Sequence, residues 1–360
     1  CFAQHVSRAL DNHGFQRFIT ETGAAWMSPE FARSQQFGLY SARYGNVYTP
    51  RQALQLLLRA FGEFKPQEPA WQFNNSSGHF ADPFRPNVQL NGFKSIDELL
   101  ADRATHLTAV RKMFESADWL ILTLGLTEAW HSLADGAIFP MAPGVIAGSY
   151  DSASHAFINL SVTDCMTDLE TLCHRVHEIN PRMEIILTVS PVALAATYET
   201  QHVWYSTVYS KSALRVAAEN CANQFGFVSY FPAYEIITSP LNANNYLKDD
   251  MREVNAAGVA HVMRCFFDTY TESILTPSST PSLTDDMAVV CEESSLNAES
   301  DEIRISLSDS IVLRDFDEAA YLQANADVAA GIKAGIVESG SAHFIAYGRF
   351  ENRPLRPDNL

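Results

Sequence analysis

The sequence has no long hydrophobic run and few basic residues. Its longest apolar run, residues 119–126, has the length of a strand and falls short of the roughly 20 residues that a membrane-spanning helix needs. We therefore predict no membrane span. Only 25 Lys and Arg stand against 42 Asp and Glu, which gives a net charge of −17. Since the basic residues form no patch, we do not expect a nucleic-acid partner.

Cysteine pairs and cofactor motifs are also missing. The six cysteines have no C-x-x-C spacing, and three of them lie on apolar helix positions, where cysteine acts as a small buried hydrophobe. This usage favours a reducing compartment, so we predict a cytoplasmic protein. The chain has no P-loop, no G-x-G-x-x-G and no G-x-S-x-G elbow. We therefore predict no nucleotide, nicotinamide or other cofactor.

One pair of histidines has a spacing that metal sites use. His174 and His177 lie three residues apart on a predicted helix, which places both rings on one face. No third ligand stands at a suitable spacing, and a solvated helix face explains the pair better. The sequence predicts no metal site.

Residues 1 to about 270 alternate between amphipathic and continuously apolar segments. Helical spacing of apolar residues covers 50–61, 96–116, 162–179, 205–225 and 255–270, and continuous apolar runs cover 118–124, 183–189 and 227–231. Repeated strand–loop–helix units predict an α/β domain with a parallel sheet and helices on both faces. Ligands bind such sheets at the carboxyl ends of the strands, so the residues after each run are the site candidates.

The acidic charge is concentrated beyond this domain. Residues 271–308 contain eight acidic residues and one basic residue, a net charge of −7 in a segment rich in Ser, Thr and Pro. We predict that this segment is a mostly disordered linker. Aromatic residues and regular spacing return over 309–360, which predicts a small separate helical module.

Polar residues follow the first predicted strand. Gly125 lets the backbone approach a ligand and present N–H groups to an oxyanion. Thr127 and Glu128 supply a hydroxyl and a carboxylate beside it. A glycine turn that leads into a helix cap explains these residues equally well.

More polar residues follow the other two strands. His202 titrates near neutrality and is a predicted general base, although a histidine on a surface loop fits the pattern too. Tyr209, Ser210 and Lys211 follow it closely. Glu235 comes after the third strand, where it orients a histidine or faces water. The sequence thus predicts a polar site at the carboxyl edge of the sheet.

Two features lie outside the strand ends. Asn46 follows a glycine in a loop and is either an oxyanion donor or a turn residue. The irregular segment 62–95 is long for a connection inside a compact domain, which predicts a lid or a substrate wall.

Several strings along the chain resemble the GSCFA family. That family is named for a Gly-Ser-Cys-Phe-Ala block, and this chain opens Cys1-Phe2-Ala3. The other matching strings are residues 40–49, 122–130, 188–192, 209–212 and 230–236. The family in turn resembles the SGNH/GDSL hydrolases. This resemblance implies a three-layer α/β/α flavodoxin-like fold in which the first block carries a nucleophilic serine.

The resemblance also implies a Gly-Ser pair directly before Cys1. A processed N-terminal nucleophile and a lipidated first cysteine are the alternative interpretations of this start. The former needs a two-sheet fold, and the latter needs a flexible tether, whereas a helical pattern begins at once. We therefore interpret the chain as a fragment that lacks its first strand and its nucleophile, and we expect no serine-hydrolase activity from it.

The sequence departs from the SGNH pattern at the catalytic base. SGNH enzymes carry Asp-x-x-His just before the closing helix, whereas residues 249–258 contain no histidine. Either His202 replaces this base, with Glu235 or Asp250 as the residue that orients it, or the chemistry differs, or the site binds without turnover.

The remaining roles complete this interpretation. Gly125 and Asn46 stabilise the oxyanion. The residues predicted to line the substrate are Thr127, Glu128, Tyr209, Ser210 and Lys211. The alternative bases are His261 and His131.

Two functions from different classes follow. The leading hypothesis is a serine esterase or acyltransferase of SGNH type, with an O-acylated carbohydrate as substrate by analogy alone. The alternative is a non-catalytic binding protein that uses the same cleft, which the missing Asp-x-x-His favours. The C-terminal module resembles a short repeat of bacterial surface-polysaccharide and secreted proteins, through residues that include 316–318, 321–322 and 351–353. His343 in this module is predicted to be structural.

Overall fold

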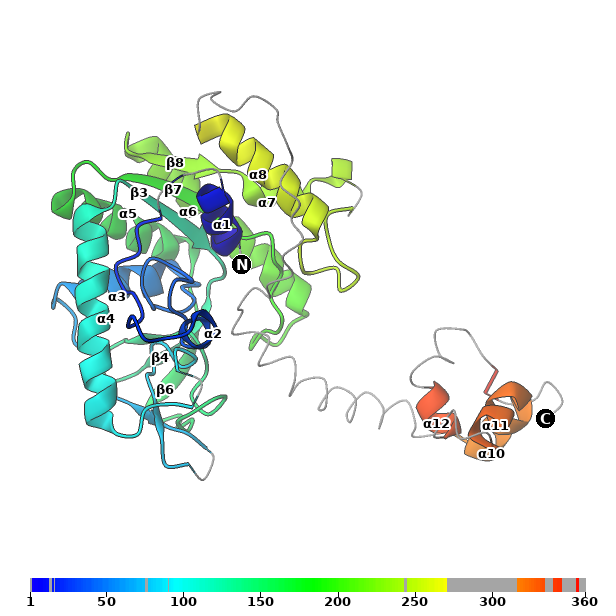
Figure 1. Ribbon diagram of the computed structural model, residues 1–360. Helices are drawn as coiled ribbons and strands as arrows, with labels where there is room; N and C mark the ends of the chain where they lie inside the picture. The colour runs from blue at the N-terminus through cyan, green and yellow to red at the C-terminus, as the bar shows by residue number, and fades with distance from the viewer. Residues whose placement is uncertain are drawn as a thin grey trace. The chain divides into compact units, whose positions relative to one another are not determined.

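The computed structural model divides the chain into two compact units, Cys1–Glu292 and Glu293–Leu360 (Figure 1). The residues it describes are 2–12, 15, 17–74, 77–89, 91–242, 245–270, 316–333, 339–344 and 354–355. The linker predicted over 271–308 lies outside these residues, as do parts of the predicted module.

A parallel sheet forms the centre of the first unit. Its strands are β3 (Trp119–Leu124), β7 (Glu184–Val189) and β8 (Val228–Phe231), in the order β3-β7-β8. All three coincide with the continuous apolar runs of the sequence, as buried parallel strands do. The predicted α/β class with a parallel sheet is confirmed.

Helices pack against the sheet to form two cores. The first core joins the sheet to α3 (Pro50–Ala60), α4 (Ile96–Ser116), α5 (Val162–Ile179) and α6 (Val203–Gln224). The second core joins it to α1 (Phe2–Asn12), α7 (Ala233–Thr238) and α8 (Ala256–Tyr270) (Figure 1). On β7, Ile185 and Leu187 belong to the first core and Ile186 to the second. Because side chains alternate along a strand, the cores lie on opposite faces of the sheet.

The connection between β3 and α5 contains a second sheet that the sequence did not predict. Its strands are β4 (Glu128–Ser132), β5 (Ile138–Phe139) and β6 (His155–Asn159), which pair antiparallel in the order β5-β4-β6. A third sheet pairs β1 (Trp71–Gln72) with β2 (Phe80–Ala81), and the short helices are α2 (Pro29–Ser34) and η1 (Pro240–Asn242). Trp71, Phe84 and Phe139 form a separate apolar cluster beside these strands. Trp71 and Phe84 belong to the segment predicted as a lid or a substrate wall, so this part of it is packed into a core.

The second unit has its own small core. Its described helices are α10 (Glu318–Ala324), α11 (Ala326–Lys333) and α12 (Gly340–His343). Tyr321, Val328 and Phe344 are buried against one another, and His343 Nδ1 lies 3.1 Å from the Tyr321 hydroxyl.

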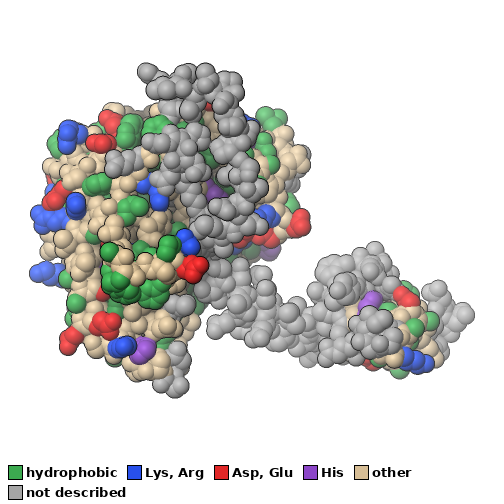
Figure 2. Space-filling model, in the orientation of Figure 1, with side chains coloured by type: hydrophobic (Ala, Val, Ile, Leu, Met, Phe, Trp, Pro, Cys, Tyr) green, Lys and Arg blue, Asp and Glu red, His purple; other side chains and the backbone are tan. Residues whose placement is uncertain are grey.

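Two surface properties can be stated for the described residues. None of their helices is both long enough and apolar enough to span a membrane. Figure 2 shows acidic and basic side chains of the first unit interspersed with uncharged ones on the displayed face.

Candidate functional site

The carboxyl ends of β3 and β7 meet at one edge of the parallel sheet. Leu124 and Val189 pair at the last position of the two strands, and the Ser190 N–H donates to the Leu124 carbonyl over 2.9 Å. Gly125 and Ser190 therefore begin two neighbouring loops at this edge, where the sequence predicts the site.

Both backbone groups of Gly125 are engaged. Its N–H donates to the Tyr48 carbonyl over 2.8 Å, and its carbonyl accepts from Lys211 Nζ over 2.6 Å. A Cβ on Gly125 would lie 3.3 Å from the Tyr48 carbonyl oxygen, so a larger residue would push these segments apart. In this arrangement Gly125 positions Tyr48 and Lys211. Its predicted N–H donation to an oxyanion requires the contact with Tyr48 to open.

Lys211 is the most unusual titratable group at this edge. It lies on α6, is 1% exposed, and donates to the carbonyl of Gly125 as its one hydrogen-bond partner among the described residues. Burial, together with the smaller effect of the nearby charge of Arg252, lowers the pKa of Lys211 to about 7. Because this pKa is near neutral pH, Lys211 can accept and return a proton there.

Thr127 and Ser210 form a buried hydrogen-bonded row. The Thr127 hydroxyl donates to Asn159 Oδ1 over 2.6 Å, so the Ser210 hydroxyl, 2.7 Å away, donates to Thr127. Asn159 Nδ2 continues the row to Glu199 over 2.9 Å. Thr127 and Ser210 are 0% exposed, so their hydroxyls hold the residue before β4 against α6.

Two other predicted residues lie near this row. Glu128 accepts from the Thr197 hydroxyl over 2.6 Å and from the Tyr198 N–H over 3.3 Å. Burial raises the pKa of Glu128, while these hydrogen bonds oppose the rise. The Tyr209 hydroxyl donates to the Leu160 carbonyl over 3.3 Å, and its ring remains 41% exposed.

Asn46 is linked to the first turn of α1. Its Oδ1 accepts from the Tyr40 hydroxyl over 2.7 Å, and that hydroxyl accepts from Gln4 Nε2 over 2.7 Å. No described residue accepts a hydrogen bond from Asn46 Nδ2, so this amide remains available as a donor. The sequence identified Asn46 but gave no signal for Tyr40 or Gln4, because a bond across 36 residues leaves no local pattern.

The predicted base and its orienting carboxylates do not meet. His202 is exposed at the N-cap of α6, where its Nδ1 accepts from the Trp204 N–H over 3.2 Å. Glu235 is held by Arg215 at 2.5 Å and by the Tyr230 hydroxyl at 2.8 Å. Asp250 accepts from the backbone of its own turn. Among the described residues no hydrogen bond or ion pair joins His202 to either carboxylate, so their joint catalytic role stays a prediction.

Of the two alternative bases, His261 has a side-chain partner, whereas Nδ1 of His131 is buried without a hydrogen bond to any described residue. His261 lies 2.8 Å from the Tyr246 hydroxyl through its Nδ1. His131 lies on β4, and burial lowers its pKa.

The histidine pair with metal-site spacing packs against aromatic rings. His174 packs edge-on against Phe225, and His177 stacks on Phe227 at 4.3 Å. In the part of the chain that the structure describes, no three His, Cys, Asp or Glu side chains gather as metal ligands.

Comparison with known proteins assigns a family. The sequence pattern that defines the GSCFA family matches residues 1–266, so the chain belongs to the GSCFA family. No curated protein matches the sequence.

Proposed function

We propose that residues 1–266 of this GSCFA-family chain form a domain of the SGNH type, with a flavodoxin-like α/β/α fold, that cleaves or transfers an acyl ester. One observation carries the proposal: a continuous set of hydrogen bonds that runs from the first turn of α1 to Lys211. It passes from Gln4 through Tyr40 to Asn46, and then through Gln52 and Tyr48 to Gly125 and Lys211.

The nucleophile in this proposal is the serine that the SGNH resemblance places directly before Cys1. That position is at the N-terminal end of α1, close to one helical turn before Gln4, where helix N–H groups favour a developing negative charge. Asn46 hydrogen-bonds to Tyr40, and Tyr40 to Gln4. Asn46, the proposed oxyanion donor, is therefore linked through Tyr40 and Gln4 to the same helix that carries the nucleophile at its N-terminal end.

The proposed reaction proceeds in two proton transfers. The serine oxygen attacks the ester carbonyl carbon, and its proton passes to the neutral amine of Lys211, while Asn46 Nδ2 donates to the oxyanion. As the carbon–oxygen bond of the leaving group breaks, the Lys211 ammonium returns the proton to the departing alkoxide. Water, or a hydroxyl of an acceptor, then attacks the acyl-serine. Lys211 again accepts the proton of the attacking group and returns it to the serine oxygen as the acyl bond breaks. Hydrolysis and transfer differ only in that second nucleophile.

Lys211 is favoured over His202 as the base because of where each side chain lies. Lys211 is buried beside Gly125, whereas His202 is exposed and caps a helix. A buried amine with a pKa of about 7 has the proton affinity that a base needs at neutral pH.

The alternative is a non-catalytic domain that binds carbohydrate. It is favoured by an aromatic group on the small antiparallel sheet, in which Trp130 contacts Tyr150, Phe157 and Tyr198 with ring centroids 4.7–5.9 Å apart. Tyr150 is 52% and Tyr198 58% exposed. Exposed aromatic rings with polar tips suit a sugar, which is apolar on its faces and polar at its rim.

A fluorophosphonate probe distinguishes these functions. The protein to use is the chain extended by Gly-Ser before Cys1, with a matched control that carries alanine in place of that serine. We expect labelling at the added serine, none in the control, and a labelling rate lower by about 100-fold or more in Lys211→Met. His202→Ala should leave the rate unchanged.

Other outcomes reject parts of the proposal. Loss of labelling in His202→Ala but not in Lys211→Met would restore the base predicted from sequence. A folded, extended chain that is never labelled would reject the esterase. The binding function would then lead, and Tyr198→Ala should weaken the retention of the protein on an oligosaccharide column.

A further inference from the structure

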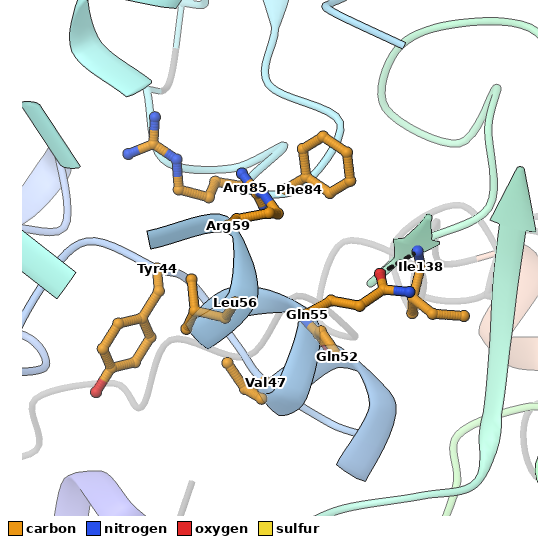
Figure 3. A pocket seen from close by; sticks show the side chains of 9 residues that line it. All are labelled: Tyr44, Val47, Gln52, Gln55, Leu56, Arg59, Phe84, Arg85 and Ile138. Carbon is orange, nitrogen blue, oxygen red and sulfur yellow. Dashed lines mark hydrogen bonds between the residues drawn. The ribbon is translucent and has the colours of Figure 1, made fainter. Parts of the chain in front are cut away.

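A small pocket lies between α3 and the segment that follows β2, and it shares Gln52 with the hydrogen-bonded set of the proposed ester site. Six of the residues that line it are Gln52, Gln55, Arg59, Phe84, Arg85 and Ile138 (Figure 3). Its volume is about 10 Å³, the space of one water molecule or one small ion. A sugar or an ester does not fit.

Arg59 is a buried cation with no acceptor beside this pocket. It is 8% exposed, and its guanidinium carbon lies 3.9 Å from the centre of the Phe84 ring. Its Nη2 is buried, and no described residue accepts a hydrogen bond from it. A buried charged group that lacks a hydrogen-bond acceptor is destabilising, so a missing acceptor is expected here.

The other arginines near Arg59 are fully paired. Asp82 is 0% exposed and accepts from Arg85 over 2.9 Å and from Arg103 over 2.8 Å. Arg85 also donates to Asp102 over 2.7 Å. Asp82 also accepts from the Phe84 N–H over 3.1 Å and from Arg103 Nε over 3.2 Å, so each of its oxygens already accepts two hydrogen bonds.

A second group of charged residues, centred on Arg43 and Glu21, adjoins these arginines. Its own charges cancel, so the net charge stays the same. Arg43 donates to Asp102 over 2.8 Å and lies 3.6 Å from Glu21, which also contacts His106 Nδ1 at 2.7 Å. Burial lowers the pKa of His106 to about 4, so this ring is neutral at pH 7. Four arginines thus face three carboxylates, which leaves one positive charge. The members of the cluster are Glu21, Arg43, Arg59, Asp82, Arg85, Asp102, Arg103 and His106.

The neutral polar groups of the pocket are also occupied. Gln52 accepts from the Tyr48 N–H and donates to the Asn46 carbonyl. Gln55 accepts from the Ile138 N–H over 2.8 Å and donates to the Gly136 carbonyl (Figure 3). The described residues therefore offer Arg59 Nη2 a pocket but no hydrogen-bond acceptor.

We propose that this pocket binds one small monovalent anion, with chloride as the probe, held by the Arg59 guanidinium that stacks on Phe84. The anion accepts hydrogen bonds from Nη2 of Arg59 and neutralises the single excess charge of the cluster. The volume excludes sulfate and phosphate. The bound anion joins α3 to the segment after β2, so its effect is on the stability of the first unit.

Thermal unfolding of the full chain tests the site. We compare sodium chloride with sodium gluconate at constant ionic strength, so that only the identity of the anion changes. Chloride should raise the Tm by about 2–4 °C in a saturable way. Arg59→Met should abolish this response without lowering the Tm in gluconate, because it removes a buried guanidinium whose Nη2 has no hydrogen-bond acceptor there.

Arg111→Met is the matched control. Arg111 also lies over a phenylalanine, at 4.8 Å from the ring centre of Phe61, but its side chain is 52% exposed and pairs with Glu115. This variant should keep the full chloride response. Loss of the response in both variants would indicate a general salt effect and overturn the proposal.

Crystals of the full chain soaked in bromide give a second readout that needs no variant. An anomalous peak beside Arg59 is the expected result. No peak there, or equal Tm values in chloride and gluconate, would mean that water is the acceptor, and the anion site would be rejected.

Discussion

Lys211 and Arg59 are both buried bases, and their chemistry gives them different roles. An amine loses its proton readily when it is buried, and the pKa of Lys211 falls to about 7. A guanidinium holds its proton more strongly, and burial lowers the pKa of Arg59 only to about 9. Lys211 can therefore exchange a proton at neutral pH, whereas Arg59 remains a cation that needs an anion.

The low pKa of Lys211 predicts a pH-dependent stability. In the unfolded chain its pKa is 10.5, so between pH 7 and 10.5 the unfolded state binds more protons than the folded state. The free energy of unfolding therefore rises with pH over this range. From pH 7 to 9 we expect a gain of about 2 kcal/mol in the parent relative to Lys211→Met, measured by urea denaturation. Parallel profiles for the two proteins would show that Lys211 titrates normally.

At the scale of elements, capping residues set where helices begin. Ser95 and Ser161 accept from the backbone N–H groups of Glu98 and Asp164, which begins α4 and α5. Asp164 completes a capping box by accepting from the Ser161 N–H. The predicted ranges 96–116 and 162–179 match these helices because the apolar spacing and the caps agree.

Gly258 in α8 gives a test in which packing opposes helix propensity. Alanine is the better helix former, by up to about 1 kcal/mol. A Cβ at Gly258 would lie 2.8 Å from Tyr246 Cβ and 2.8 Å from Val254 Cγ1, and Tyr246 Cβ cannot move without its backbone. We expect Gly258→Ala to lower the free energy of unfolding by about 1–2 kcal/mol in urea denaturation.

Gly226→Ala is the control for this substitution. A Cβ at Gly226 meets nothing within 4 Å, so the change in the free energy of unfolding should be small. A stabilised Gly258→Ala protein would show that α8 can shift away from the loop that contains Tyr246.

At the scale of the whole molecule, each unit has its own core. The apolar clusters of the first unit draw on residues between Val6 and Tyr270, and the cluster of the second on residues between Phe316 and Phe344. We expect a chain that ends at Tyr270 to have the same urea midpoint as the first unit has in the full chain. A lower midpoint for the shortened chain would show that the residues after Tyr270 stabilise the first unit.

By itself, the sequence determined the parallel sheet and its helices. Continuous apolar runs mark buried parallel strands, and spacing of three and four residues marks helices, so both patterns are local. The second sheet left no such pattern. Its longest strands have five residues and carry polar side chains such as His131, Ser132 and His155. Pairing across the connection, and not local preference, makes them strands.

Only the tertiary structure decided which polar residues act together. The sequence identified Asn46, Gly125 and Lys211 separately, but the bond between Lys211 and Gly125 spans 86 residues. His202 matched a general base by residue type, whereas its backbone contact two residues away makes it a helix cap. Residue type therefore limits the chemistry that each side chain can perform. Burial and long-range pairing, which shift a pKa and choose a partner, are set by the fold.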